Sequence, residues 1–121
     1  MTPAFYSLAA DAITDEQMQP SNLVDPAAFT SDDHEEHILP IYHSDDGAIV
    51  SGIWECDPCL QEVPAYPVNE MMTIISGSLT LTDAEGSSKA YGPGDSLFIA
   101  RGATFTWHNA EKLKKYFMSC G

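Results

Sequence analysis

The chain has 121 residues, enough for one domain with its own core and too few for two. Its 18 acidic residues against five basic ones give a formal net charge of −13, and an acidic surface repels nucleic acid and anionic membranes. No apolar run approaches the roughly 18 residues that a membrane helix needs. Residues 1–12 lack the positive charge of a secretory signal, and an odd number of cysteines, three, suits a reducing compartment. We therefore expect a cytoplasmic protein with no nucleic-acid or membrane partner.

The first 38 residues differ in composition and periodicity from the rest of the chain. They are acidic, contain three prolines and show no sustained periodicity. Thr14 followed by Gln17 is typical of a capping box and predicts a short helical turn around Asp11–Met18. His34 and His37 are three residues apart, but a solvated charged stretch explains them better than a site. We interpret residues 1–38 as an arm that packs on the remaining domain or on a partner subunit.

From residue 39 to 121, short β-rich runs alternate with turn signals every eight to twelve residues, roughly as in sandwiches and barrels. Ser44–Gly47 and Asp83–Gly86 predict hairpin turns, and Gly77 divides one apolar run into two strands. The sequence therefore predicts an all-β domain over residues 39–121. The predicted strands are Ile41–His43, Ala48–Cys56, Gln61–Tyr66, Asn69–Ser76, Ser78–Thr82, Lys89–Tyr91, Ser96–Ile99, Ala103–His108 and Leu113–Met118.

Two motifs with fixed spacing restrict the choice among all-β folds. Five residues have the spacing G-x5-P-x-G-x2-H-x3-N, which is the second sequence motif of cupins. They are Gly94, Ala100, Gly102, Phe105 and Asn109, with alanine in the proline position and phenylalanine in the histidine position. The first cupin motif ends in H-x-H-x3-E-x6-G, or with x4. Glu70 and Gly77 keep its last spacing, while its histidine positions hold Pro64 and Tyr66, or Val63 and Ala65 in the longer form.

More narrowly, residues 39–119 resemble the small cupins grouped with ureidoglycine aminohydrolase and the ethanolamine-utilisation cupins. The matching stretches are Gly52–Glu55, Asn69–Glu70, Ser76–Gly77, Gly92–Asp95, Ala100–Gly102, and Trp107 with Glu111, Lys114 and Lys115. The resemblance implies a cupin double-stranded β-helix, that is, a jelly-roll barrel, and a homodimer. It says little about function, because one fold hosts many chemistries.

Cupins of this kind hold Mn, Fe, Ni or Zn with three histidines and one glutamate, and this chain keeps only the glutamate, Glu70. One carboxylate does not bind a transition metal tightly. Alternation along residues 103–108 points His108 away from the side on which Phe105 and Trp107 lie. We expect no tightly bound cofactor, with weak metal binding through Glu70 as the remaining alternative.

The predicted barrel interior is an apolar pocket with one acid. Period-two alternation places Glu70 and Met72 on one face, with Phe105 and Trp107 across the barrel. We predict Glu70 as the catalytic acid or base of any reaction, and Tyr66, Met72, Phe105, Trp107 and Trp54 as ligand-binding residues. The alternative is structural: Glu70 hydrogen-bonds Tyr66, Trp54 or a buried water, and the apolar side chains fill the core.

Two other patterns have mainly structural interpretations. Cys56-Asp-Pro-Cys59 lacks a second cysteine pair, so two reduced thiols beside a proline turn explain it better than a zinc or redox site. The basic cluster of Lys112, Lys114 and Lys115 is interpreted as a surface patch that pairs with the acidic arm.

Three functional hypotheses remain open at this point. The first is a metal-independent cupin, a homodimer as the resemblance implies, that binds or transforms a small polar organic molecule. The second is a metal-dependent aminohydrolase like the ureidoglycine enzyme, and the third is a non-catalytic sensor or assembly domain. The sequence identifies neither the ligand nor the reaction.

Overall fold

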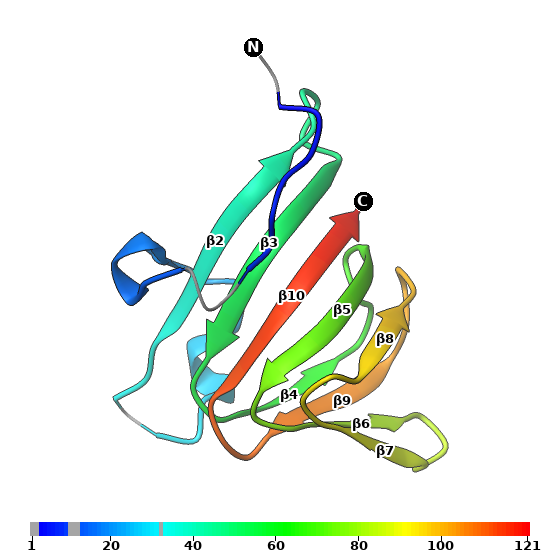
Figure 1. Ribbon diagram of the computed structural model, residues 1–121. Helices are drawn as coiled ribbons and strands as arrows, with labels where there is room; N and C mark the ends of the chain where they lie inside the picture. The colour runs from blue at the N-terminus through cyan, green and yellow to red at the C-terminus, as the bar shows by residue number, and fades with distance from the viewer. Residues whose placement is uncertain (1–2, 10–12, 32) are drawn as a thin grey trace.

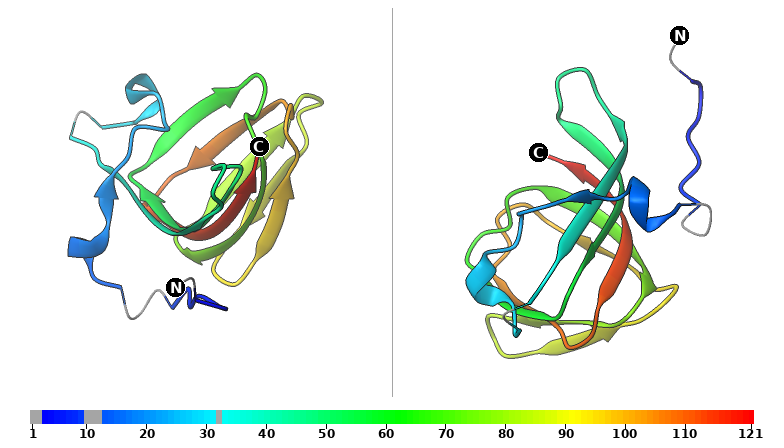
Figure 2. Two further views of the ribbon diagram at one scale, coloured as in Figure 1. Left: turned by 90° about the horizontal axis from the view of Figure 1, so that it is seen from above. Right: turned by 90° about the vertical axis from the view of Figure 1, so that its left-hand side faces the viewer.

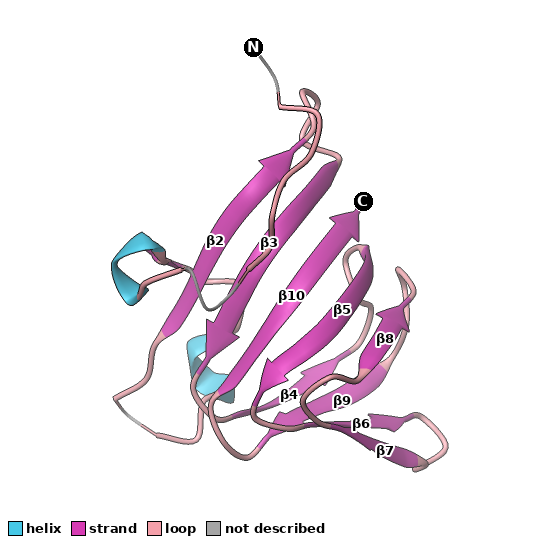
Figure 3. Ribbon diagram, in the orientation of Figure 1, coloured by secondary structure: helices cyan, strands magenta, loops and turns pink. Residues whose placement is uncertain are grey.

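The computed structural model describes residues 3–9, 13–31 and 33–121 and contains two antiparallel sheets that face each other across a barrel (Figures 1 and 3). One sheet has the strand order β1-β2-β3-β10-β5-β8 and the other β4-β9-β6-β7. The strands are β1 Gln19–Pro20, β2 Glu36–His43, β3 Ile49–Cys56, β4 Cys59–Val63, β5 Asn69–Ser76, β6 Leu79–Asp83, β7 Ser88–Tyr91, β8 Ser96–Ile99, β9 Phe105–Asn109 and β10 Leu113–Cys120.

Consecutive strands alternate between the sheets for much of the chain, so that β10 lies between β3 and β5, and β9 lies between β4 and β6. This interleaving is the jelly-roll arrangement, and the predicted all-β class is confirmed. In the view from above, the strands surround the interior (Figure 2, left). None of the described helices is long and apolar enough to span a membrane.

From residue 48 onward, the strand ends agree with the sequence prediction to within three residues. The largest difference is β2, which begins at Glu36 inside the predicted arm. Its first residues pair with the end of β3, Glu36 opposite Cys56, and this partner strand gives them a regular conformation. The predicted helical turn is a 3-10 helix at Asp15–Gln17, capped as expected by a hydrogen bond of 2.8 Å from the Thr14 amide to Gln17 Oε1. Residues 11 and 12 of that prediction lie outside the described residues.

Gly77, between β5 and β6, is needed for two reasons. Its φ of +84° is a conformation that side chains other than glycine adopt at a cost. A Cβ atom at this position would also lie 2.2 Å from the Lys112 carbonyl oxygen. The glycine therefore lets the chain turn from one sheet to the other while touching the segment before β10.

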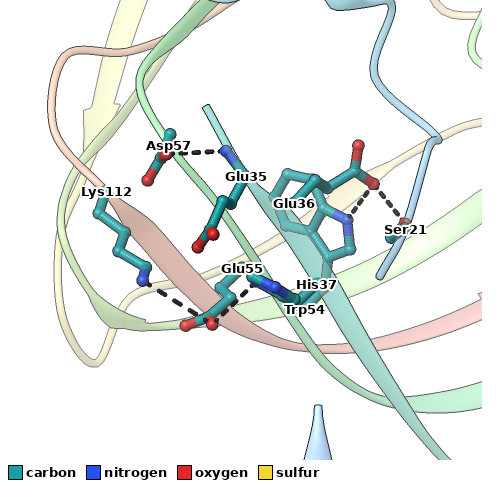
Figure 4. A network of polar contacts seen from close by, with 8 residues as sticks. All are labelled: Ser21, Glu35, Glu36, His37, Trp54, Glu55, Asp57 and Lys112. Carbon is teal, nitrogen blue, oxygen red and sulfur yellow. Dashed lines mark hydrogen bonds and ion pairs between the residues drawn. The ribbon is translucent and has the colours of Figure 1, made fainter. Parts of the chain in front are cut away.

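The arm is fixed to the barrel by one buried carboxylate. Glu36, on β2, accepts hydrogen bonds from the Ser21 hydroxyl, the Leu23 and Val24 amides, and Trp54 Nε1 at 2.9 Å. Figure 4 shows Glu36 between the Ser21 segment and the Trp54 indole. Hydrogen bonds to a charged acceptor are stronger than neutral ones, so these four bonds offset the cost of burying the carboxylate. They also fix the arm and the Trp54 side chain of β3 to the same residue.

We predict that Glu36→Gln loosens the arm. The amide keeps one acceptor but turns an NH2 group toward a cluster of donors, so the expected loss is about 2 kcal/mol of unfolding free energy. Amide hydrogen exchange at Leu23 and Val24 should become faster, whereas Glu35→Gln, which alters an exposed neighbouring residue, should leave it unchanged. Equal protection of the two amides in wild type and Glu36→Gln would show that the carboxylate does not anchor the arm.

Candidate functional site

The centre of the barrel contains a buried ion pair between two strands of the larger sheet. Lys115, on β10, and Glu70, on β5, are only 4% and 7% exposed, and the distance from Nζ to Glu70 Oε2 is 2.5 Å. The two residues are brought together because β5 and β10 are neighbours and both side chains lie on the inner face. Each charge would be costly to bury alone, and the pair neutralises both.

The ammonium group also lies between two indole rings. Lys115 Nζ is 4.8 Å from the ring centroid of Trp54 and 5.0 Å from that of Trp107. The two rings are nearly perpendicular, with an interplanar angle of 89° and centroids 6.1 Å apart. Cation–π attraction is strongest where the cation is shielded from water, as it is here. The Sδ atom of Met72 completes the surroundings at 3.7 Å.

The hydroxyl of Tyr66 also contacts the ion pair. It donates a hydrogen bond of 3.0 Å to Glu70 Oε1, the oxygen that Lys115 does not use. Burial, reinforced by the negative charge of Glu70 and this hydrogen bond, raises the pKa of Tyr66 well above its usual value. The phenol therefore remains protonated and acts as a donor at physiological pH.

Beside this pair lies a cavity of about 470 Å³. Its polar centre is formed by Glu70, Lys115 and Tyr66, and the arm contributes Leu23 and Val24 to its wall. The remaining lining residues are mostly apolar: Ile38, Val50, Trp54, Val63, Pro64, Ala65, Pro67, Val68, Trp107 and Phe117, with Gln61, Glu62 and Ser119 as polar exceptions. This volume is in the range of small-molecule sites.

Four of the six residues predicted for the site line this one cavity: Glu70, Tyr66, Trp54 and Trp107. Met72 is buried on the same face and contacts Lys115 instead of the cavity. Phe105 packs against the Tyr66 ring, with centroids 5.5 Å apart, and lines a second hollow between β4, β6 and β9. The geometry therefore brings four of the six predicted residues to one cavity and leaves Met72 and Phe105 outside its lining.

Lys115 is the residue that the sequence analysis misplaced. Its assignment to a surface patch is wrong, because it is one of the most buried charged residues in the described chain. Lys112 does lie at the surface, 3.9 Å from Glu55 (Figure 4). A signal was present: Leu113, Lys115 and Phe117 share one face of a strand, so a lysine between two apolar residues pointed inward.

Asn109, the last residue of the second motif, holds Trp107 and the two cysteines. Its Oδ1 accepts from Trp107 Nε1 at 3.0 Å and from Cys59 Sγ at 3.1 Å. Hydrogen bonding with Cys59, followed by burial, raises the pKa of Cys56, so its thiol stays neutral. The cysteines lie fully buried in the core, in agreement with the structural interpretation of this pair.

The residues around Glu70 do not fit a transition-metal centre. None of the four histidines lines the cavity. The Lys115 ammonium group binds the Glu70 oxygen that a metal ion would use as a ligand. In the described ranges, no three His, Cys, Asp or Glu side chains are grouped so that they could hold a metal ion. A second cation beside Lys115 would be repelled, so we derive no step through a metal.

Comparison with known proteins agrees with this architecture. A model of the EutQ-like cupin domain matches residues 43–117. The chain belongs to this cupin family. No curated protein matches it in sequence.

Three solved structures show the extent of the similarity. A protein of unknown function of the DUF861 family from Pseudomonas syringae pv. tomato has a TM-score of 0.75 and 24% identity over 84% of this cupin, which spans 43% of that chain. A putative ethanolamine utilization protein Q from Salmonella typhimurium has a TM-score of 0.67 and 13% identity, with 96% and 92% of the two chains covered. The EutQ protein of Clostridium difficile has a TM-score of 0.63 and 10% identity, with 96% and 93% covered. At these identities the similarity establishes the fold alone, and a relation to ureidoglycine aminohydrolase remains a prediction.

We predict that Lys115→Met destabilises the cupin by about 3 kcal/mol, because it leaves the Glu70 carboxylate buried without its cation. The double variant Glu70→Gln/Lys115→Met should be more stable than the sum of the single changes implies. Lys114→Met is the matched control, since the neighbouring side chain is only partly buried, and it should change stability by less than about 0.5 kcal/mol. Urea unfolding of wild type, the two single variants Glu70→Gln and Lys115→Met, the double variant and Lys114→Met measures these effects, and strictly additive effects would contradict the ion pair.

Proposed function

We propose that this cupin binds a small, uncharged organic molecule with one polar group in the barrel, beside Glu70 and Lys115, and that it does so without a resident metal ion. The observation that carries the proposal is the position of Lys115 Nζ, which lies 2.5 Å from Glu70 at the edge of the cavity. In this arrangement a lysine of the chain supplies the positive charge that a metal ion would otherwise bring.

The charge balance of the interior supports an uncharged ligand. Glu70 and Lys115 carry opposite charges and neutralise each other, so a charged molecule would bring an uncompensated charge into an apolar space. The hydroxyl or the amide N–H of an uncharged ligand can donate to a remaining acceptor site of Glu70 or to the oxygen of Tyr66, whose own proton is donated to Glu70.

Apolar walls favour a ligand whose remaining surface is a ring or a short hydrocarbon chain. Glu70 is also the group best placed to exchange a proton with such a molecule, and its catalytic role remains a prediction. The cavity supports the binding hypothesis over a purely structural domain, since a barrel that served only assembly would be expected to fill its interior with side chains.

Three probes of one size and different charge test the proposal: benzamide, benzoate and benzylammonium. Each fits a cavity of about 470 Å³. We predict that benzamide raises the melting temperature and quenches the tryptophan fluorescence of Trp54 and Trp107 more than either charged probe. Ala65→Trp, which places a bulky ring on an exposed lining residue, should abolish the response without altering the buried pair.

Two results would contradict the proposal. One is an equal response to all three probes, or one that Ala65→Trp leaves intact, since neither agrees with a selective site in the barrel. The other is stoichiometric Mn, Ni, Fe or Zn in protein purified without chelators, provided that Glu70→Gln removes the metal. That second result would restore the metal-dependent hypothesis.

A further inference from the structure

Lys115 brings a primary amine to the wall of the ligand cavity. Its side chain is only 4% exposed to solvent, and it lines the cavity of about 470 Å³. The other three lysines, Lys89, Lys112 and Lys114, all lie in described parts of the chain and do not line this cavity. A lysine amine in an apolar pocket is a nucleophile that can form a Schiff base with a carbonyl carbon. Lys115 is therefore the lysine that a ligand in the barrel would meet.

The ammonium group can hold a carbonyl oxygen before any covalent bond forms. An ammonium has three N–H donors. Among the described residues, Nζ has two hydrogen-bond acceptors, Glu70 Oε2 at 2.5 Å and Met72 Sδ at 3.7 Å. The third N–H can donate to a carbonyl oxygen in the cavity, and this hydrogen bond brings the carbonyl carbon next to Nζ.

Glu70 is placed to take and return the protons that the reaction moves. An amine attacks a carbonyl carbon only in its neutral form, and one Nζ proton can move to Glu70 Oε2 along their hydrogen bond. This transfer turns two buried charges into two neutral groups, and it costs less in an apolar interior than in water. Tyr66 donates to the other carboxylate oxygen, Oε1, so Oε2 is the oxygen that exchanges protons.

We propose that Lys115 captures an aldehyde as a protonated Schiff base, with Glu70 as the proton carrier. This inference rests on the proposed binding in the cavity and assigns a chemical class to the ligand. The neutral amine forms the C–N bond, and the carbonyl oxygen takes the proton from Glu70 to give a carbinolamine. The nitrogen then passes a second proton to Glu70, which delivers it to the new hydroxyl as the C–O bond breaks. Water leaves, the lysine nitrogen keeps one proton, and Glu70 is again a carboxylate, so no oxidant or reductant is needed.

The product has the same charges in the barrel as the free protein. A protonated Schiff base carries one positive charge on Nζ, so Glu70 remains its counter-ion. The indoles of Trp54 and Trp107, whose centroids lie 4.8 Å and 5.0 Å from Nζ, face this cation as they face the ammonium. Capture therefore creates no uncompensated buried charge. The two rings also crowd the nitrogen, and this favours an aldehyde, which has a hydrogen on its carbonyl carbon, over a bulkier ketone.

Benzaldehyde with sodium cyanoborohydride tests the capture, because the hydride reduces a Schiff base to a stable amine. We predict one benzyl group per chain, which peptide mass spectrometry locates on Lys115. The exposed Lys89 and Lys112 are internal references and should be labelled later. Benzamide occupies the same cavity but does not condense with an amine. At about ten times its dissociation constant it should lower the Lys115 label about tenfold and leave the Lys89 label unchanged.

Two variants locate the reaction. Ala65→Trp, which blocks the cavity, should remove the label from Lys115 and keep it on Lys89. Lys114→Arg is the matched control, since it removes the neighbouring amine, which does not line the cavity, and it should keep the full label on Lys115.

The Schiff base and the binding proposal fail in different ways. If benzamide raises the melting temperature but benzaldehyde leaves Lys115 unmodified, the cavity binds uncharged molecules and the Schiff base is wrong. If benzamide has no effect and Lys115 stays unmodified, both proposals are wrong. A Lys115 label that neither benzamide nor Ala65→Trp reduces would also overturn capture in the cavity.

Discussion

A positive charge inside an apolar barrel has to be neutralised where it lies, and the geometry of this cupin follows from that constraint. The Lys115 ammonium has Glu70 as its counter-ion, and two indole rings provide the faces that shield it from water. The pair joins β5 and β10 at the centre of the larger sheet. Removal of either partner leaves a buried charge, so the two residues act as a unit.

The surrounding side chains keep this unit in position. Trp54 is held by Glu36, which also fixes the arm, and Trp107 is held by Asn109. The segment at Ser21–Val24, the two indoles and the ion pair therefore form one connected network of hydrogen bonds and ring contacts, which ends at the cavity wall. A change in the arm can reach the cavity through Glu36 and Trp54, although Glu36 lies outside the residues that match the family model.

Much of the fold could be predicted from local pattern, because alternation and turn residues such as Gly77 determine strands one at a time. Glu70, Tyr66, Trp54 and Trp107 were predicted for one pocket, and they line one cavity. Lys115 was misplaced because a lysine in a basic cluster is usually solvated, and only the pairing of β10 with β5 brings it to Glu70. Phe105 was assigned from its motif position, but its side chain packs on Tyr66 and lines a different hollow.

The central claim is that the Lys115 ammonium lies, charged and shielded, between Glu70 and the two indoles. Nitrogen-15 NMR of the lysine side chains tests it most directly, with Lys115→Met to assign the signal. The claim predicts one ammonium resonance whose protons exchange slowly with water and show cross-relaxation to ring protons of Trp54 and Trp107, with side-chain methylenes shifted by the ring currents. Four indistinguishable, rapidly exchanging lysine ammonium groups, with no contact to either indole, would contradict it.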